Sequence, residues 1–296
     1  MNRPGECPLC GAEKVSYYLT CTDHLVSGET YDLFICNACG FVLTHDPPDE
    51  EAMGRYYASE DYVSHSDTKA GVINRLYSLA RNIMLSRKLR IISAASGLRK
   101  GSILDIGCGT GYFAAKMKAN GWNSTGIEPD CKAREFGTRQ FGLSILEPEK
   151  ISSLPGESCD VITMWHSLEH SHDPFNYMQE ILRLLKPEGL FISALPNCGS
   201  YDAMHFGDSW AAYDVPRHLW HFTPETFELF AAKTGFKVTH VSTLPFDVFY
   251  ISLLSEKHRN RKLYLLSGLA KGSFFSVRAV FNYRKSSSLV YHLRRR

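Results

Sequence analysis

Ile103-Leu-Asp-Ile-Gly-Cys-Gly-Thr-Gly-Tyr-Phe113 is the stretch that decides the fold of this 296-residue chain. A short apolar run suited to a β-strand ends in glycines at positions 107, 109 and 111, and a helix-compatible run continues to Ala119. Strand, glycine turn and helix in this order begin a βαβ unit, in which the backbone can approach a nucleotide closely. We therefore expect an α/β fold with a Rossmann-like, doubly wound, mostly parallel sheet and flanking helices.

The glycine spacing and two carboxylates restrict which nucleotide could bind at this turn. The dinucleotide fingerprint G-x-G-x-x-G needs its third glycine at position 112, which is Tyr112. Asp105 lies within the turn, where it would repel a pyrophosphate but could receive an ammonium group. Glu128 ends the next apolar run and suits an acceptor for two ribose hydroxyls.

Asp105-Ile-Gly107-Cys-Gly109-Thr-Gly111, followed by Glu128, resembles motif I and the next acidic residue of class I S-adenosylmethionine-dependent methyltransferases. The resemblance covers roughly residues 72–245, which we expect to form the methyltransferase domain, and it implies S-adenosylmethionine as the cofactor. The cofactor contacts that it implies are Asp105, Gly107, Cys108, Gly109, Gly111, Tyr112, Phe113, Glu128, Pro129, Trp165 and His166.

Cys7-Pro-Leu-Cys10-Gly and Cys36-Asn-Ala-Cys39-Gly are two C-x-x-C-G turns separated by 25 residues, with β-like sequence between them. Four thiolates at this spacing satisfy a tetrahedral Zn²⁺ ion, and a module of about 45 residues needs such a cross-link because its hydrophobic core is small. We expect residues 1–45 to form a zinc ribbon with structural zinc.

An alternative ligand set replaces the second turn with Cys21-Thr-Asp-His24, as in the zinc finger of certain ribosomal RNA guanine methyltransferases, which this set resembles. With that set, Cys36 and Cys39 would not bind the metal ion. Redox-active cysteine pairs would require a thioredoxin-type βαβ context, which the sequence around them lacks.

Composition and charge place the chain among ordinary globular proteins, with an uneven distribution of charge. Nine cysteines, no apolar signal-peptide core and no run of ~18 apolar residues favour a reducing cytoplasm. Residues 255–296 carry eleven Lys or Arg against one acid, Glu256, so the overall net charge of +2 leaves residues 1–254 acidic. The C-terminal region is therefore a basic appendage.

Between the two modules, residues 46–71 form a linker with Tyr56, Tyr57 and Tyr62, which we interpret either as a lid over the cofactor or as packing between modules. Apolar residues at three- and four-residue intervals predict a long amphipathic helix from Val72 to Ala95. Further strands and helices then alternate along the chain. The predicted elements are strands 124–127, 143–146, 159–165, 190–194 and 237–242, and helices 130–141 and 174–185.

His166 directly follows the strand 159–165, at the edge of the sheet where ligands bind in open α/β folds, and it is our first candidate for a general base. A purely structural histidine at this position is the alternative. His166, Glu169 and His170 could instead bind a divalent metal ion, as similarly placed groups do in some quinone and RNA methyltransferases.

A second polar group lies in Trp210-Ala-Ala-Tyr-Asp-Val-Pro-Arg-His-Leu-Trp-His-Phe222. This segment resembles the acceptor-side insertion of zinc-ribbon-bearing methyltransferases that act in sugar or surface-glycan pathways. Arg217 could bind a phosphate or carboxylate of the acceptor, and His218 or His221 could replace His166 as the base. A lid packed by aromatic residues is the alternative.

The last region, residues 246–296, is expected to be a basic, partly helical extension. Its apolar runs, 246–254 and 263–281, could cover the acceptor pocket, lie on anionic lipid or bind RNA phosphates. Covering the pocket is the simplest of these interpretations.

The sequence therefore predicts a cytoplasmic S-adenosylmethionine-dependent methyltransferase that acts on a small molecule, with a sugar or surface-glycan precursor favoured as acceptor. An RNA methyltransferase that uses the zinc ribbon and basic tail is the alternative enzyme. A non-catalytic regulator that binds the cofactor is the alternative outside catalysis. The pattern leaves the accepting atom and the oligomeric state open.

Overall fold

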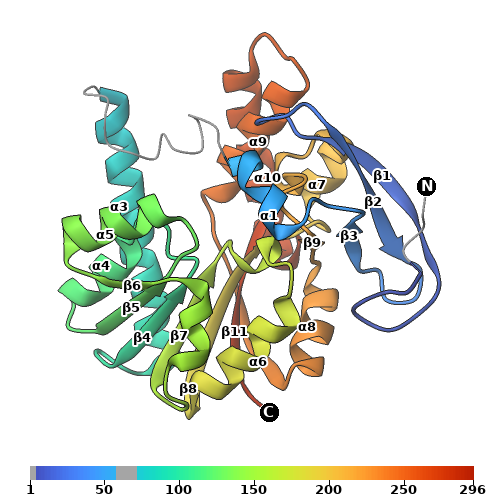
Figure 1. The fold of residues 1–296 in the computed structure, drawn as a ribbon. Coiled ribbons are helices and arrows are strands. Elements are labelled where there is room, and N and C mark those ends of the chain that lie inside the picture. The colour runs from blue at the N-terminus through green and yellow to red at the C-terminus, as the bar shows by residue number, and fades with distance from the viewer. Residues whose placement is uncertain (1–4, 58–71) are drawn as a thin grey trace.

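The computed structural model describes residues 5–57 and 72–296, with the side chains of the first helical turns up to residue 78 left aside. Its main feature is a seven-stranded sheet in the order β10-β11-β8-β7-β4-β5-β6 (Figure 1). The strands are β4 (Ser102–Ile106), β5 (Asn123–Ile127), β6 (Ser144–Leu146), β7 (Cys159–Trp165), β8 (Leu185–Pro196), β10 (Phe236–Thr243) and β11 (Ser288–Arg295).

Helices cover both faces of this sheet, because its central strands are apolar on both sides. Leu104 and Ile162 face one cluster of buried side chains, and their neighbours Ile103 and Val161 face another. In Figure 1, α3, α4 and α5 lie on one side of the sheet, and α6 and α8 lie on the other. The expectation of a doubly wound, mostly parallel α/β fold is thus confirmed.

The helices begin where the sequence offers capping groups. Asp130 caps α5, Asp173 caps α6 and Thr223 caps α8, each through a side-chain oxygen that accepts a backbone N–H. The α-helices are α1 (Glu50–Met53), α3 (Val72–Ser96), α4 (Tyr112–Ala119), α5 (Cys131–Phe141), α6 (Pro174–Leu184), α7 (Tyr201–Phe206), α8 (Pro224–Lys233), α9 (Asp247–His258) and α10 (Tyr264–Phe281). The short 3₁₀ helices are η1 (Gly54–Tyr57), η2 (Pro148–Ser153), η3 (Leu168–His170), η4 (Gly207–Ser209), η5 (Ala211–Tyr213) and η6 (Tyr283–Lys285).

The main sheet extends beyond the boundary that we expected at residue 245. β11, which lies in the supposed extension 246–296, is inserted between β8 and β10 and runs antiparallel to both. Its residues are buried from Ser288 to Leu293, so it is a core strand. The sequence did not predict this strand, because the basic residues at the end of β11 are typical of a solvated tail.

A second, four-stranded sheet contains the predicted ribbon, in the order β1-β2-β3-β9. β1 (Val15–Thr22), β2 (Thr30–Cys36) and β3 (Val42–Thr44) come from the N-terminal module, and their positions agree with the predicted β-like runs. The fourth strand, β9 (Trp220–His221), comes from the segment 210–222 and pairs with β3. The N-terminal module and the methyltransferase domain therefore share one sheet.

Helices α9 and α10 form a hairpin that packs tightly through two glycines. A Cβ atom at Gly268 would lie 2.7 Å from the Leu253 Cα atom, and one at Gly272 would lie 3.0 Å from the Phe249 Cα atom. Side chains at either glycine would force the helices apart. Within the described ranges, no helix combines the length and apolar character needed to cross a membrane.

Substitution of Gly268 by Ala should lower the free energy of unfolding by about 1–3 kcal/mol, even though alanine favours helix formation, because the added methyl group meets backbone atoms of α9. Urea titration of both proteins measures the difference. Gly54→Ala is the matched control, since nothing lies within 4 Å of a Cβ atom there, and it should not destabilise the protein. Equal stability of G268A and wild type would contradict the tight packing.

Candidate functional site

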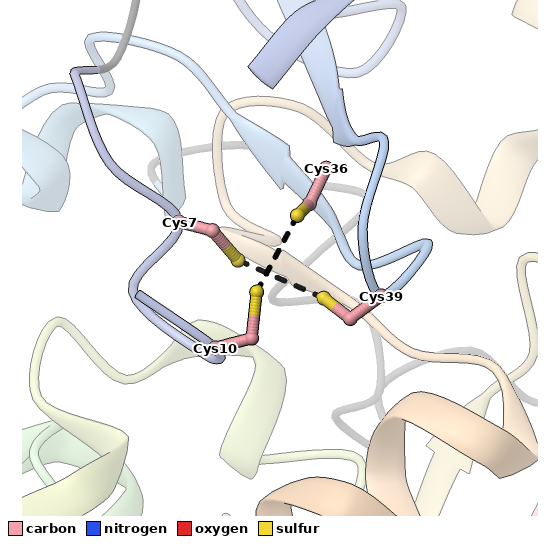
Figure 2. Close-up of side chains that lie close together, drawn as sticks. All are labelled: Cys7, Cys10, Cys36 and Cys39. Carbon is pink, nitrogen blue, oxygen red and sulfur yellow. Dashed lines mark hydrogen bonds between the residues drawn. The ribbon is translucent and has the colours of Figure 1, made fainter. Parts of the chain in front are cut away.

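The four cysteines of the two C-x-x-C-G turns converge on one point in Figure 2. The Sγ atoms of Cys7 and Cys39 are 3.8 Å apart, and those of Cys10 and Cys36 are 3.5 Å apart. The glycine after each turn, Gly11 or Gly40, has a positive φ and donates its N–H to the first cysteine of its turn. This arrangement fits a tetrahedral metal ion with four thiolate ligands.

The alternative ligand pair does not join this cluster. Cys21 is buried in an apolar cluster with Leu33 and Trp210. His24 stacks its ring on that of His258, with ring centroids 4.1 Å apart. The second C-x-x-C-G turn, and not Cys21 with His24, therefore completes the four-cysteine cluster.

The glycine turn after β4 holds its three glycines in the left-handed region, with φ values of +72° at Gly107, +54° at Gly109 and +81° at Gly111. A side chain at Gly107 would overlap Ser167, and one at Gly111 would meet Leu143 at 2.7 Å. Nothing lies within 4 Å of a Cβ atom at Gly109, so only this glycine borders open space. The turn therefore presents bare backbone at the carboxyl end of β4, as a bound nucleotide requires.

The two predicted carboxylates lie on either side of this turn. Glu128 accepts the N–H of Gly109 at 2.7 Å and that of Asp130 at 3.0 Å, so its carboxylate lies directly at the glycine turn. Asp105 is buried and accepts a hydrogen bond from the Thr163 hydroxyl at 2.6 Å. Burial raises the pKa of Asp105 to about 7, while Thr163 and Lys88 act against this rise. Burial also raises the pKa of Glu128.

Aromatic residues and a lysine border the same region. Phe113 meets Trp165 edge-on at 5.6 Å, and the Nζ atom of Lys88 lies 4.3 Å from the centre of the Trp165 ring. Burial lowers the pKa of Lys88, and Asp105 and Asp247 partly offset that effect. The sequence analysis did not select Lys88. Its position in the apolar stripe of α3, three residues after Leu85, was the available signal.

The remaining predicted cofactor contacts occupy the rim. The Tyr112 ring lies under the Arg81 guanidinium at 3.9 Å and packs against Phe141. The Cys108 side chain points toward Gly126 of β5, and burial raises the pKa of its thiol. Pro129 is exposed beside Glu128. Only the backbone of Cys108, and not its thiol, is therefore placed at the turn surface.

His166 follows β7 with a positive φ of +55° and donates its backbone N–H to Ala194. Its Nε2 atom lies 3.0 Å from an Asp247 oxygen, and its Nδ1 atom lies 3.5 Å from a Glu169 oxygen. Burial lowers the pKa of His166, but the two carboxylates outweigh burial and raise it to about 9. The imidazole is therefore protonated at neutral pH, which does not suit the general base that the sequence suggests.

Arg217 does not serve as the acceptor anchor that the sequence suggests. Its side chain is 1% exposed, and every guanidinium nitrogen has a partner. It donates to Asp214 at 2.6 Å, to Asp23 of the ribbon at 2.9 Å and to the Tyr56 carbonyl at 3.0 Å. Burial and these contacts withdraw the guanidinium from a substrate and instead join the ribbon, the linker and the segment 210–222.

His221 is also unsuited to proton transfer from an acceptor. It lies in β9, is 4% exposed, and shares a 3.0 Å hydrogen bond with the Thr44 hydroxyl. Burial and the neighbouring His218 lower the pKa of His221 to about 3. Of the two predicted alternatives, only His218 approaches the residues that follow β7, with its ring centroid 4.5 Å from that of His170.

One tyrosine of the linker, Tyr57, also reaches the residues that follow β7. The Tyr57 hydroxyl lies 3.0 Å from Nδ1 of His170, whereas Tyr56 is buried between the modules and bonds to Glu29 and Tyr31. Tyr62 lies outside the described residues. The linker thus serves packing at Tyr56 and borders the candidate site at Tyr57.

Comparison with known proteins agrees with this geometry. A family model described as a methyltransferase domain matches residues 79–241, more than half of the chain. The chain therefore belongs to the methyltransferase domain family, as the resemblance in its glycine turn predicted.

Its curated relatives include two proteins named ubiquinone biosynthesis O-methyltransferase. The one from Histophilus somni is 35% identical over 113 residues, which are 34% of this chain and 48% of the relative. The one from Cupriavidus pinatubonensis is 25% identical over 173 residues, which are 54% of this chain and 70% of the relative. The chain thus spans about half the length of the first relative.

Two solved structures share the fold. Magnesium protoporphyrin IX methyltransferase from Synechocystis, with bound S-adenosylhomocysteine, superposes with a TM-score of 0.54 at 10% identity and covers 83% of this chain and 100% of its own. Phosphoethanolamine N-methyltransferase 2 from Haemonchus contortus, in complex with S-adenosylmethionine, gives 0.51 at 17% identity and covers 71% and 52%. At these identities the similarity concerns the fold alone.

Replacement of Arg217 by Met should lower the free energy of unfolding by about 3–5 kcal/mol, because the buried carboxylate of Asp23 loses its partner. Urea titration measures this loss. The matched control is Arg139→Met, which removes an exposed Arg–Glu pair at 2.6 Å and should change stability by less than about 1 kcal/mol. Similar effects for the two variants would show that the Arg217 contacts do not hold the modules together.

Proposed function

We propose that the protein transfers a methyl group from S-adenosylmethionine to an oxygen of a small-molecule acceptor. The observation that carries this proposal is the bare glycine turn at Gly109, with Glu128 hydrogen-bonded to it and Asp105 buried behind it. Asp105 would receive the ammonium group of the cofactor, and Glu128 would accept its ribose hydroxyls. The bound cofactor supplies an activated methyl group.

The chemistry requires positioning more than covalent catalysis. Methyl transfer from a sulfonium is an in-line displacement, so the protein has to hold donor and acceptor in a near-attack geometry and exclude water. Phe113 and Trp165 form an apolar wall beside the turn that suits this task. His166 would keep a positive charge at the end of β7, because both of its ring nitrogens face carboxylates, those of Asp247 and Glu169.

The acceptor class rests on the relatives and on the segment 210–222. A sugar or surface-glycan precursor remains our first candidate, because that segment resembles an acceptor-side insertion of sugar-pathway methyltransferases. A phenolic quinone precursor is the second candidate, favoured by the printed names of the curated relatives. An RNA acceptor is supported less, because the residues at the outer face of α10 are largely apolar.

The experiment that tests the function incubates methyl-labelled S-adenosylmethionine with purified protein and fractionated extract, with and without RNase. Label in an RNase-resistant small-molecule fraction supports the proposal, and it should disappear in Glu128→Ala because that variant loses the ribose contact. RNase-sensitive label would instead identify an RNA methyltransferase. Tight cofactor binding without transfer to any fraction would favour the non-catalytic regulator.

Cofactor affinity should depend on pH through Asp105. The ammonium group attracts the ionised carboxylate, so binding below the pKa of about 7 releases one proton from Asp105. The Kd for S-adenosylmethionine should therefore rise about tenfold per pH unit as the pH falls below about 7. Calorimetry between about pH 5.5 and 8 measures this slope, and Asp105→Asn should bind weakly with no such slope. A flat profile for the wild type would refute the role of Asp105.

We also propose that Cys7, Cys10, Cys36 and Cys39 bind a structural zinc ion, on the evidence of their converging thiols. Cys36→Ser should lose one zinc equivalent and lower the melting temperature by at least about 5 °C, or roughly 2 kcal/mol. Elemental analysis and calorimetry measure both effects. The control is Cys131→Ser, an exposed cysteine outside the cluster, which should retain zinc and melting temperature. Unchanged zinc content in C36S would refute the ligand set.

A further inference from the structure

A second group of metal-binding side chains lies where the segment 210–222 meets the end of β7. Glu169 and His170 belong to η3, which follows β7, and His218 comes from the segment 210–222. The ligand atoms of these three residues all lie within 4.8 Å of one another. The Leu219 N–H donates to the Glu169 carbonyl at 2.8 Å and holds the two segments together.

Hydrogen bonds through Nδ1 orient the rings of the two histidines. Nδ1 of His170 lies 3.1 Å from the Arg217 carbonyl oxygen, and Nδ1 of His218 lies 2.9 Å from that of Ala212. A carbonyl oxygen can only accept, so each contact places a proton on Nδ1, and a neutral imidazole then has a lone pair on Nε2 that can bind a metal ion. The Tyr57 hydroxyl, 3.0 Å from Nδ1 of His170, can accept from the same N–H. Histidines that bind metal ions are oriented in this way, by a hydrogen bond from the ring nitrogen that does not bind the metal.

The Glu169 carboxylate lacks the donors that a buried charge needs. Its side chain is 1% exposed, and neither oxygen accepts a hydrogen bond from any residue in the ranges 5–57 and 72–296. The nearest cationic nitrogen, Nδ1 of His166, is 3.5 Å from Oε1. This one ion pair leaves the buried carboxylate without the hydrogen bonds that normally offset burial of a charge, whereas a bound cation would satisfy it.

The fourth side of the cluster is also acidic. An oxygen of Asp214 lies 3.8 Å from Nε2 of His218, the nitrogen that faces the cluster. A lone pair and a carboxylate repel each other unless a proton or a metal ion lies nearby. Arg217 neutralises part of the Asp214 charge but contacts it from another side, through Nε and Nη2.

We propose that Glu169, His170 and His218 bind a divalent transition-metal ion, such as Zn²⁺, at a second site distinct from the four cysteines. Two imidazole nitrogens and one carboxylate oxygen are the ligands of known catalytic zinc sites, which leave a coordination position open. His166, which the sequence analysis grouped with Glu169 and His170, is instead an outer cation held by Asp247. His218 replaces it among the ligands.

The role of this ion rests on the proposed function. An acceptor hydroxyl oxygen at the open position would lose its proton more easily, because a bound divalent cation lowers the pKa of the hydroxyl. The proton leaves to water, the oxygen–carbon bond forms, the sulfur–carbon bond breaks, and S-adenosylhomocysteine leaves. This role would supply a deprotonation for which His166, held between two carboxylates, and the buried His221 are not placed.

Zinc content measures the site directly. Wild-type protein equilibrated with zinc and freed of loose metal should hold two equivalents per chain, and His218→Ala and Glu169→Gln should each hold one. The matched control is His240→Ala, which removes an exposed histidine of β10 and should keep two. One equivalent in the wild type, or two in H218A and E169Q, would overturn the proposal.

Cobalt absorption separates the two sites and serves as a folding control. Co²⁺ at the cysteine site gives an ultraviolet sulfur-to-metal charge-transfer band, whereas Co²⁺ bound by nitrogen and oxygen gives only visible bands. H218A should keep the charge-transfer band and lose the additional visible absorption. Calorimetry with S-adenosylmethionine on the same samples distinguishes the two proposals: intact cofactor binding without a second metal would overturn only the metal site.

An independent observation concerns the outer face of α10. Gly268, Gly272 and Phe275 face inward, but large apolar side chains face outward over the length of the helix. The exposed apolar residues in and around α10 are Leu263, Leu265, Leu266, Leu269, Phe274, Val277, Val280, Phe281 and Tyr283. A contiguous apolar face of this kind is unusual on a free surface and marks an interaction site.

The charge around this face indicates its partner. Residues 257–285 contain eight Lys or Arg and no Asp or Glu. An apolar helix face bordered by basic side chains is complementary to an anionic lipid surface, in which acyl chains lie beneath negative head groups. We propose that the α10 face binds the surface of an anionic membrane without crossing it.

Co-sedimentation with vesicles tests this surface. The protein should bind phosphatidylglycerol vesicles at low salt, bind neutral phosphatidylcholine vesicles at least tenfold less, and lose binding in the double variant Leu266→Glu, Val280→Glu. The control Tyr17→Glu places a charge on an exposed ribbon residue and should bind as wild type. The proposal would be overturned if the wild type did not bind vesicles, or if the double variant bound them equally well. It would also be overturned if the wild type formed a dimer in solution and the double variant was a monomer.

Discussion

The buried guanidinium of Arg217 is the contact on which the arrangement of the modules depends. One planar group binds Asp23 of the ribbon, the Tyr56 carbonyl of the linker and Asp214 of the segment 210–222. Charges removed from water are tolerated only when each has a partner, so none of the three segments can move without cost to the others. The β3–β9 pairing and the Leu219–Glu169 hydrogen bond extend this connection to the end of β7.

The candidate site therefore depends on parts of the chain that the usual domain description separates. The cofactor region is built by β4, β5 and β7, whereas His218 and Tyr57 come from segments that the ribbon holds in place. Zinc at the four cysteines would thus stabilise the surroundings of the acceptor as well as the ribbon itself.

The sequence predicted the sheet, the cysteine cluster and the positions of Asp105 and Glu128, because local patterns determine them. It could not predict that Arg217 forms a buried ion pair with Asp23. The two residues are 194 positions apart, so no local sequence pattern indicates their contact. The same holds for the partner of His166: Asp247 lies 81 residues away at the start of α9, and its charge changes the expected role of the histidine. Strand β11 was not predicted because the arginines at its end are typical of a solvent-exposed tail, although its first six residues are buried.

The position of β11 also has a consequence for synthesis of the chain. β10 pairs with no other strand of the described sheet, so it has no hydrogen-bonding neighbour until residues 288–295 have been made. A nascent chain that has reached residue 287 therefore has an open strand edge on β8 and an unattached β10, both exposed to aggregation. Residues 288–295 must therefore leave the ribosome before the main sheet can close.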